Sequence, residues 1–356
     1  MNQIGTMDAE RKLVDVAVVA HNEQAQIERC LDSLLNQSAY AEIRSIVVID
    51  NCSTDSTADR IVRFFKSHAD VKWSFYQTNK NALGDSRNFA LNQVDGSRWI
   101  CYVDADSVLP VDWLASHIEN YQTLEVQYPN LCAVGGGNRL PQRGLLEKII
   151  NIALGSFFGH GGSAQGQIPG IAEEKNHIPT ANGMFKVSAL KQVGGVASMQ
   201  VGEDFDLGVR LRRAGFKLFL CPKPTCENDC IDNLWGWFRR MFRFSHFGGA
   251  YSLAKGHFHL PVLAGILYPV GVVASLFWPS LFFVYLAVLL VESIYLTGLK
   301  QAYLVIPVTG LLMITHLSYS VGTWAGISQW LTGQHPLFLA DQHKPFEARL
   351  VTVVEV

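Results

Sequence analysis

The sequence predicts an α/β fold, with a mostly parallel sheet flanked by helices and with interfacial and transmembrane helices at its C-terminal end. Two observations carry this prediction. Up to about residue 256, short apolar runs of strand length alternate with segments whose apolar residues recur at helical spacing. From His257 to Ala340, Glu292 and Lys300 are the only formally charged residues, which is typical of a chain in contact with lipid.

The soluble part reads as alternating strands and helices. The helix expected at 24–37 has the clearest pattern, with Ile27, Leu31 and Leu34 on one face. Residues 138–180 are rich in glycine and give no clear element. The expected strands are 14–20, 45–49, 71–76, 99–103 and 131–134, and the other expected helices are 55–66, 86–92, one after Asp112, 188–193 and one that opens at 202–206.

The composition and charge of the chain disfavour nucleic acid as a partner and indicate its cellular setting. The chain has 356 residues, with 29 Lys and Arg against 31 Asp and Glu, so no excess of positive charge favours nucleic acid. Charged residues near the N-terminus, with no long apolar run before them, exclude a signal peptide. The seven cysteines are an odd number, and several fall in apolar strands, which favours a reduced cytosolic setting.

Residues 233–258 mix bulky aromatics with Arg239, Arg240 and Arg243, which predicts an amphipathic helix in a membrane interface. The alternative is a core helix whose arginines point to solvent. Residues 259–332 predict two to four membrane-embedded segments, because one span needs only about 20 residues. Trp278–Ser280 offers a break, and Pro307 or Gly310 a kink.

The predicted organisation is therefore a catalytic domain at 1–232, the interfacial region at 233–258, membrane helices at 259–332 and a tail at 333–356. The basic cluster beside the membrane segments predicts that the catalytic domain lies on the cytoplasmic side of the cell (inner) membrane, with a multi-pass or hairpin anchor.

Two acids, Asp104 and Asp106, follow the apolar strand at 99–103. The carboxyl ends of parallel strands face the crevice where α/β proteins bind ligands. Paired carboxylates there suit a hard divalent cation that takes its other ligands from water and substrate phosphates. The alternative is an Asp-rich turn without a metal.

Other polar residues end the neighbouring strands, namely Asn22, Glu23, Asp50 and Arg87. A carboxylate that can bind a nucleobase or ribose, an arginine and a metal-binding pair of acids together suit a nucleoside diphosphate. The sequence has no glycine-rich dinucleotide fingerprint after its first strand and no P-loop, so those two classes are disfavoured.

These motifs, taken in order over about residues 13 to 250, resemble glycosyltransferase family 2, whose members have the GT-A fold. Asn51 and Cys52 depart from the family pattern, which has Asp and Gly there, and this leaves Asp50 as the residue expected to recognise the base. The matching segments are 18–23, 49–55, 86–88, 104–106 and Glu203-Asp204.

A narrower resemblance is to the succinoglycan-biosynthesis type of membrane-attached glycosyltransferase. It rests on the Gly-Gly-Ser-Ala loop at 161–164, the aromatic and basic run at 241–244 and the hydrophobic C-terminal segments.

The resemblance implies roles for individual residues. Asp204 would be the general base of an inverting transfer, with Glu203 beside it. Asp104 and Asp106 would bind Mn²⁺ or Mg²⁺, Arg240 and Arg243 the diphosphate, and Asn182 and Gly183 would line the acceptor side. The donor nucleotide would contact Ala20, Asn22, Glu23, Asp50, Arg87 and Asp104.

The implied reaction moves a hexose from a UDP-sugar to a lipid or to a polyprenyl-linked or other lipid-linked saccharide, next to membrane lipids. Alternatives are a nucleotidyltransferase, a catalytically inactive membrane scaffold or translocation partner with the same fold, and a processive polysaccharide synthase. An acid at the start of a helix can also be a simple cap, which is the plain structural interpretation of Glu203 and Asp204.

Overall fold

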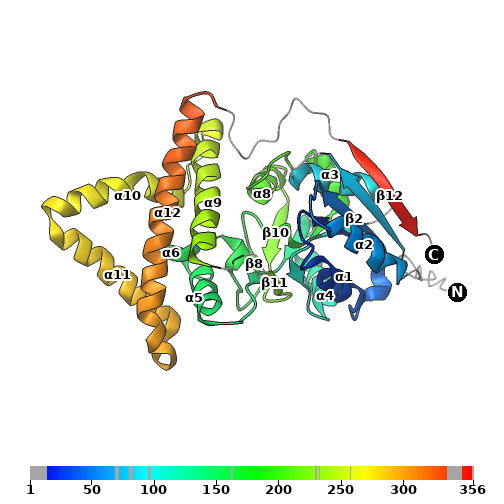
Figure 1. Cartoon of the computed structure of the whole chain (residues 1–356), viewed down its shortest axis with the longest axis horizontal. Helices are drawn as coiled ribbons and strands as arrows, with labels where there is room; N and C mark the ends of the chain where they lie inside the picture. The colour runs from blue at the N-terminus through cyan, green and yellow to red at the C-terminus, as the bar shows by residue number, and fades with distance from the viewer. Residues whose placement is uncertain are drawn as a thin grey trace.

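A computed structural model describes residues 14–68, 72–79, 83–94, 98–161, 163–228, 231, 233–256, 258–334 and 347–354 (Figure 1). Its main element is a nine-stranded sheet in the order β12-β3-β2-β1-β4-β9-β6-β10-β8. In that order the strands are Ala348–Val354, Trp73–Thr78, Ile43–Asn51, Val14–Ala20, Trp99–Asp104, Asn182–Lys186, Leu131–Gly135, Lys217–Leu220 and Glu173–Glu174.

The predicted parallel sheet is confirmed in its centre, where β3, β2, β1 and β4 pair in parallel. β1 and β4 are short and almost wholly buried, as expected when helices cover both faces. β9 lies antiparallel between β4 and β6, and β8 and β12 are antiparallel at the two edges. The sheet is therefore mixed rather than fully parallel.

Successive residues of β1 point alternately into the two hydrophobic cores on the two faces of the sheet. Val16 and Val18 of β1 pack with α1 (Ile27–Leu35), α2 (Thr57–Lys66) and α4 (Trp113–Gln127), whereas Ala17 faces the core formed with α3 (Leu83–Gln93), α7 (Val187–Gln192) and α8 (Glu203–Arg213). This two-residue alternation is what a strand buried on both faces requires.

The glycine-rich stretch contains elements that the pattern did not predict. These are α5 (Leu145–Leu154), the short α6 (Phe157–His160) and a 3₁₀ turn at Ala164–Gly166. A small second sheet joins β5 (Ser107–Val108), β11 (Cys226–Asn228) and β7 (Asn138–Arg139). It brings β11 next to the segment that follows Asp106.

The C-terminal part consists of α9 (Leu234–Lys255), α10 (Leu260–Phe277), α11 (Pro279–Thr297), the 3₁₀ segment Leu299–Leu304 and α12 (Val305–Leu331). Three helices in the described part of the chain are long and apolar enough to cross a membrane. The break expected at Trp278 is confirmed, because it separates α10 from α11. The kink expected at Pro307 is not found there: Pro307 lies in the first turn of α12, where a helix accommodates proline, and the irregular residue is Gln301.

α9 packs along α12 and stands between it and the catalytic sheet (Figure 1). Trp237 and Met241 are fully buried, whereas Arg239 and Arg243 are exposed. The helix is thus more embedded in protein than an interfacial helix resting on lipid.

The segment 333–356, expected to be a tail, contains a strand. β12 returns to the catalytic sheet and pairs antiparallel with the edge strand β3. The N–H of Asn79 donates to the carbonyl of Glu347, and the N–H of Glu347 donates to Oδ1 of Asn79, so the contact continues beyond the strand.

Candidate active site

The carboxyl ends of β1, β2 and β4 meet at one edge of the sheet and open into a cavity of about 140 Å³. The strand ends place backbone and side chains of the predicted motifs on one wall, as the parallel topology requires. The residues lining this cavity include Ala20, His21, Glu23, Asn51, Leu83, Asp104 and Asp106.

The structure gives Asp50 a different position from the one expected of a base-recognition residue. Asp50 is buried; its Oδ1 accepts the N–H of Ser53 at 3.1 Å and its Oδ2 accepts Nε2 of Gln77 at 3.1 Å. It is Asn51 that lines the cavity beside Ala20. Cys52 has a φ of +63°, the left-handed conformation that explains why glycine suits this position.

Asn22 does not line this cavity; it links the loop after β1 to the loop at 51–55 by hydrogen bonds. Its φ is +58°, a conformation that asparagine tolerates, and its Oδ1 accepts the N–H of Thr54 at 2.8 Å. Its own N–H donates to Oγ of Ser53 at 2.8 Å. Any contribution of Asn22 to donor binding therefore acts through the shape of the loop at 51–55.

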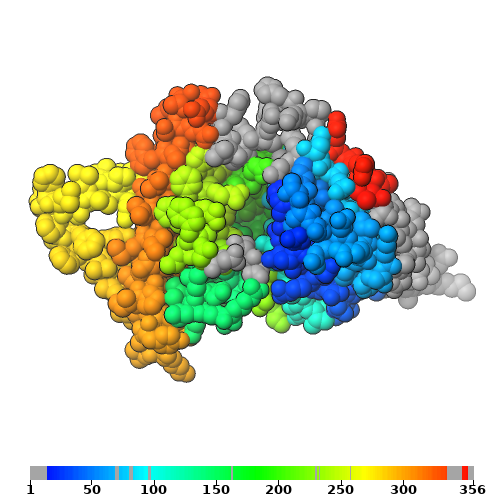
Figure 2. Space-filling model, viewed as in Figure 1, coloured from blue at the N-terminus to red at the C-terminus, as the bar shows by residue number. Residues whose placement is uncertain are grey.

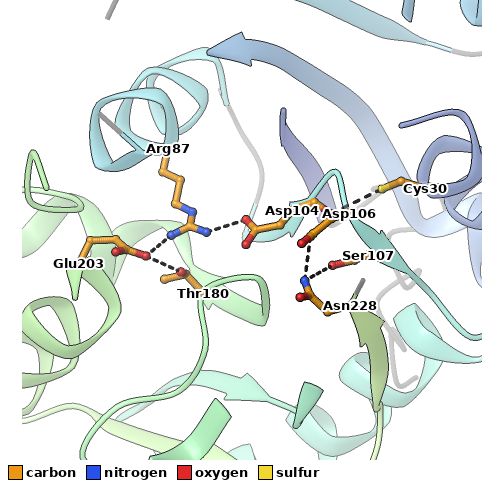
Figure 3. Close-up of polar contacts among 8 residues, drawn as sticks. All are labelled: Cys30, Arg87, Asp104, Asp106, Ser107, Thr180, Glu203 and Asn228. Carbon is orange, nitrogen blue, oxygen red and sulfur yellow. Dashed lines mark hydrogen bonds and ion pairs between the residues drawn. The ribbon is translucent and has the colours of Figure 1, made fainter. Parts of the chain in front are cut away.

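Arg87 lies between two carboxylates that are far apart in sequence (Figure 3). One guanidinium nitrogen donates to Oδ1 of Asp104 at 2.8 Å, and the other donates to Oε1 of Glu203. The side chain is only 1% exposed. Arginine has the planar fork that such a double contact needs, so Arg87 links the predicted metal-binding acid to the predicted catalytic pair.

Asp106 is held from another side by Asn228 of β11, whose Nδ2 donates to Oδ1 of Asp106 at 2.7 Å (Figure 3). Burial and the adjacent charge of Asp104 raise the pKa of Asp106, against the opposing effect of Arg240. Two half-buried carboxylates, separated in sequence by Ala105, form a donor set that a hard cation would stabilise.

Among the described residues, no group of three or more histidine, cysteine or acidic side chains is placed to hold a metal ion, here or elsewhere. A cation held by Asp104 and Asp106 would therefore need water and substrate oxygens to complete its shell. The two residues fit a divalent cation bound together with a diphosphate.

Glu203 and Asp204 open α8, directly after Gly202, whose φ is +79°. Burial raises the pKa of both carboxyl groups, and Arg87 opposes the shift on each. Acids in a first turn are favoured by the helix dipole, but the cap residue Gly202 makes no side-chain cap bond. The two acids face a second cavity, of about 200 Å³.

This second cavity shares Leu83 and Asp104 with the first. Arg240 and Arg243 of α9 line it opposite the acids, so the later helix supplies positive charge to a site made mostly by the sheet domain. Thr180, which had no role in the sequence interpretation, also lines it and donates to Oε1 of Glu203 at 3.4 Å.

Asn182 and Gly183 lie inside the sheet, within β9. The Oδ1 of Asn182 accepts Nε1 of Trp113 at 2.8 Å, and its Nδ2 donates to the carbonyls of Gly137 and Pro224. With its amide fully engaged and 0% exposed, Asn182 braces the sheet, and any contribution to acceptor binding is indirect.

Comparison with known proteins agrees with this fold. The model of the family described as Glycosyl transferase family 2 matches residues 15–193. A mannosyltransferase from Pyrobaculum calidifontis, solved with GDP-Man and Mn²⁺, superposes with a TM-score of 0.55 at 19% identity, over 90% of this chain and 88% of that one. At this identity the likeness concerns the fold.

Two curated relatives are similar in sequence. A dolichyl N-acetyl-alpha-D-glucosaminyl phosphate 3-beta-D-2,3-diacetamido-2,3-dideoxy-beta-D-glucuronosyltransferase from Methanococcus voltae is 22% identical over 88% of this chain and 97% of its own length. A poly-beta-1,6-N-acetyl-D-glucosamine synthase from Staphylococcus epidermidis is 26% identical over 66% of this chain, which spans 54% of that protein.

Proposed function

Because this chain belongs to glycosyl transferase family 2, and so transfers sugars from nucleotide-sugar donors, we propose that it moves a hexose from a UDP-sugar onto a lipid-linked saccharide or lipid, with inversion. The observation that carries this proposal is the convergence of five acids and three arginines on two adjoining cavities. The narrower assignment to the succinoglycan-biosynthesis type is part of the same proposal.

The donor would lie across the two cavities. The nucleoside occupies the cavity of Ala20, Glu23 and Asn51, with Asp50 and Asn22 shaping its loop. The diphosphate lies beyond Asp104, facing Arg240 and Arg243. Mn²⁺ or Mg²⁺ held by Asp104 and Asp106 would neutralise the negative charge that develops on the departing diphosphate.

Asp204 is the general base. It accepts the proton of an acceptor hydroxyl while that oxygen bonds to the anomeric carbon and the bond from this carbon to the diphosphate oxygen breaks. One displacement inverts the configuration. Glu203 fixes Arg87, and Arg87 holds Asp104, so the base and the donor site keep their spacing.

The enzyme would work at the cell (inner) membrane, with residues 1–232 on the cytoplasmic side and α10 to α12 embedded in lipid. The Methanococcus voltae relative is named for a dolichyl-linked acceptor, which supports an acceptor of the polyprenyl class here. The first alternative function is a catalytically inactive scaffold or translocation partner. The second is a processive synthase, which the name of the Staphylococcus epidermidis relative supports.

The test uses the full chain in nanodiscs, a panel of nucleotide sugars and a polyprenyl-diphosphate saccharide acceptor. Asp204→Asn is expected to lower transfer by about 10³-fold or more while donor affinity changes little, because the base acts only in the chemical step. Asp59→Asn, an exposed acid in the first turn of α2, is the matched control and is expected to keep full activity. Full activity of the Asp204→Asn variant would show that Asp204 is not the general base. Absence of metal-dependent donor turnover in the wild-type protein would favour the inactive-scaffold alternative.

A further inference from the structure

Two more cavities follow the cavity of Glu203 and Asp204. The polar chamber, of about 280 Å³, is lined by His160, Lys175, His177, Asp204 and Tyr319, among others. The apolar chamber, of about 260 Å³, is lined by residues that include Phe157, Leu260, Ala264, Tyr268 and Tyr285.

The cavities follow one another through shared walls. Asp204 lines both the catalytic cavity and the polar chamber. Gly161, Pro261 and Tyr319 line both the polar and the apolar chamber. A route thus runs from the proposed base into the helices that are long and apolar enough to cross a membrane.

We propose that these two chambers are the acceptor site for a phosphate-bearing lipid, with its hydrocarbon chain in the apolar chamber and its phosphate group in the polar chamber. This inference rests on the proposed function, because it places the acceptor of that same reaction. The donor fills the cavities on the other side of Asp204, so a molecule that enters from the membrane meets the base from the acceptor side.

His160 supplies the evidence for a polar ligand. It is 5% exposed, it lines the polar chamber, and its Nδ1 has no hydrogen-bond partner among the described residues. An unsatisfied buried ring nitrogen is costly, and a ligand oxygen would remove that cost. The edge of the ring packs against Phe244, which fixes its place in the wall.

The charges around this chamber favour an anion. Lys175 lines it and also contacts Glu173 at 2.7 Å, and Arg240, on the adjoining cavity, lies close enough to act on His160. Burial and Lys175 lower the pKa of His177, so the positive charge comes from Lys175 and Arg240. Burial, followed by Arg240 and His177, lowers the pKa of His160 to about 3. The ring is therefore neutral, and the positive charges of Lys175 and Arg240 would stabilise a phosphate bound beside it.

The apolar chamber suits a hydrocarbon chain. It extends along α10 from Leu260 to Tyr268, about 12 Å at the rise of a helix. Its polar side chains satisfy one another: the Tyr285 hydroxyl bonds to Nδ1 of His316 at 2.9 Å, and Nε2 of His316 to the carbonyl of Phe158 at 2.9 Å. In the space-filling view α10, α11 and α12 surround an opening (Figure 2). The chamber itself is lined by residues of α10, α11 and α12, the helices that are long and apolar enough to cross a membrane.

The nucleophile would be a hydroxyl group of a saccharide carried on that phosphate. A bare phosphate is already ionised and needs no proton acceptor, whereas a hydroxyl does. Asp204 on the chamber wall supplies that acceptor, so its presence favours a saccharide-bearing lipid over a bare lipid phosphate.

The experiment measures lipid binding directly and needs no sugar transfer. A polyprenyl phosphate with a diazirine in its chain is photo-crosslinked to the full chain in nanodiscs, and mass spectrometry locates the adducts. We expect adducts on residues 157–161, 260–268 and 315–319. Unlabelled polyprenyl phosphate should compete, whereas inorganic phosphate and the neutral polyprenol at the same concentration should not.

His160→Phe keeps the ring but removes its nitrogens, and it is expected to lower crosslinking by about tenfold, the equivalent of one hydrogen bond to a charged group. His160→Gln, which restores a polar group, should recover part of it. Ala264→Trp is expected to fill the apolar chamber and have a similar effect. The matched controls are His68→Phe at the end of α2 and Ala274→Trp, which lies on α10 outside the chamber residues.

Adducts spread evenly over the outer faces of α10 to α12, or undiminished in both His160→Phe and Ala264→Trp, would overturn the inference. Transfer to a short-chain soluble acceptor without specific crosslinking would leave the proposed function standing and remove the lipid site. Specific crosslinking without transfer from any donor would leave the lipid site standing and contradict the proposed function.

Discussion

Arg87 shows how one residue connects the parts of this site. Its guanidinium contacts Asp104 at the end of β4 and Glu203 at the start of α8, with no bulk water around it. A buried cation between two carboxylates is a tight arrangement, because the loss of any member leaves a charge without its partner. The same contact keeps the proposed metal ligand and the proposed catalytic pair at a fixed separation.

Replacing Arg87 with lysine is expected to destabilise the protein by about 2 kcal/mol and to lower the rate of transfer by about 10²-fold. Lysine keeps the charge, but one ammonium group cannot span both carboxylates. Urea unfolding and steady-state kinetics measure the two effects. The control is Arg98→Lys, whose partner Glu125 is also partly exposed and which should change stability by less than about 1 kcal/mol. Equal effects of the two variants would contradict the bridging role of Arg87.

At the scale of elements, the start of α8 decides where the proposed base lies. Gly202 has a positive φ, and a Cβ placed on it would meet the ring of Phe247 of α9 at 2.2 Å. The backbone conformation and the close packing of α9 both require glycine here. α9 thereby fixes the first turn of α8 while it supplies Arg240 and Arg243 to the same cavity.

Gly202→Ala is therefore expected to shift the first turn of α8 and lower kcat by about tenfold or more, in addition to the roughly 1–2 kcal/mol that a left-handed alanine costs. Gly215→Ala is the matched control, since its φ is +86° and its Cβ would meet nothing within 4 Å. Both variants should lose similar backbone stability in thermal unfolding, and only Gly202→Ala should lose activity. Loss of activity in both would point to a general effect on folding.

At the scale of the whole molecule, the chain leaves the large sheet, forms the long apolar helices α10 to α12 and returns to the sheet as β12. The added strand pairs with β3, which would otherwise expose its backbone groups at the edge of the sheet. A recess remains between the N-terminal half and α9 (Figure 2), where the cavities of the site lie. The segments before and after the apolar helices thus both contact the domain that carries the acids.

Truncation after Gln334 removes β12 and is expected to lower the melting temperature by several degrees, which corresponds to about 1–2 kcal/mol, and to increase aggregation through the open edge of β3. Differential scanning fluorimetry and size-exclusion chromatography in detergent measure these changes. A chain shortened by the last two residues keeps β12 and serves as control. A truncated protein as stable and monodisperse as the control would show that β12 does not brace the sheet.

The sequence by itself determined the features that depend on neighbouring residues. Apolar runs and helical spacing gave the alternation of strands and helices, the acids at the end of β4 and the break at Trp278, because periodicity and turn chemistry act over a few positions. The family resemblance, now supported over residues 15–193, rested on the same short segments.

Only the tertiary structure decided what depends on pairs far apart in the chain. Arg87 and Glu203 are 116 positions apart, and Asp106 and Asn228 are 122 apart, so no local pattern indicated that they meet. The antiparallel insertion of β9, the return of β12 and the unsatisfied ring of His160 beside the polar chamber also arise from packing between distant segments. Burial and partner choice are properties of the folded chain, and they decide which of the strand-end acids are linked by Arg87 and which by Asn228.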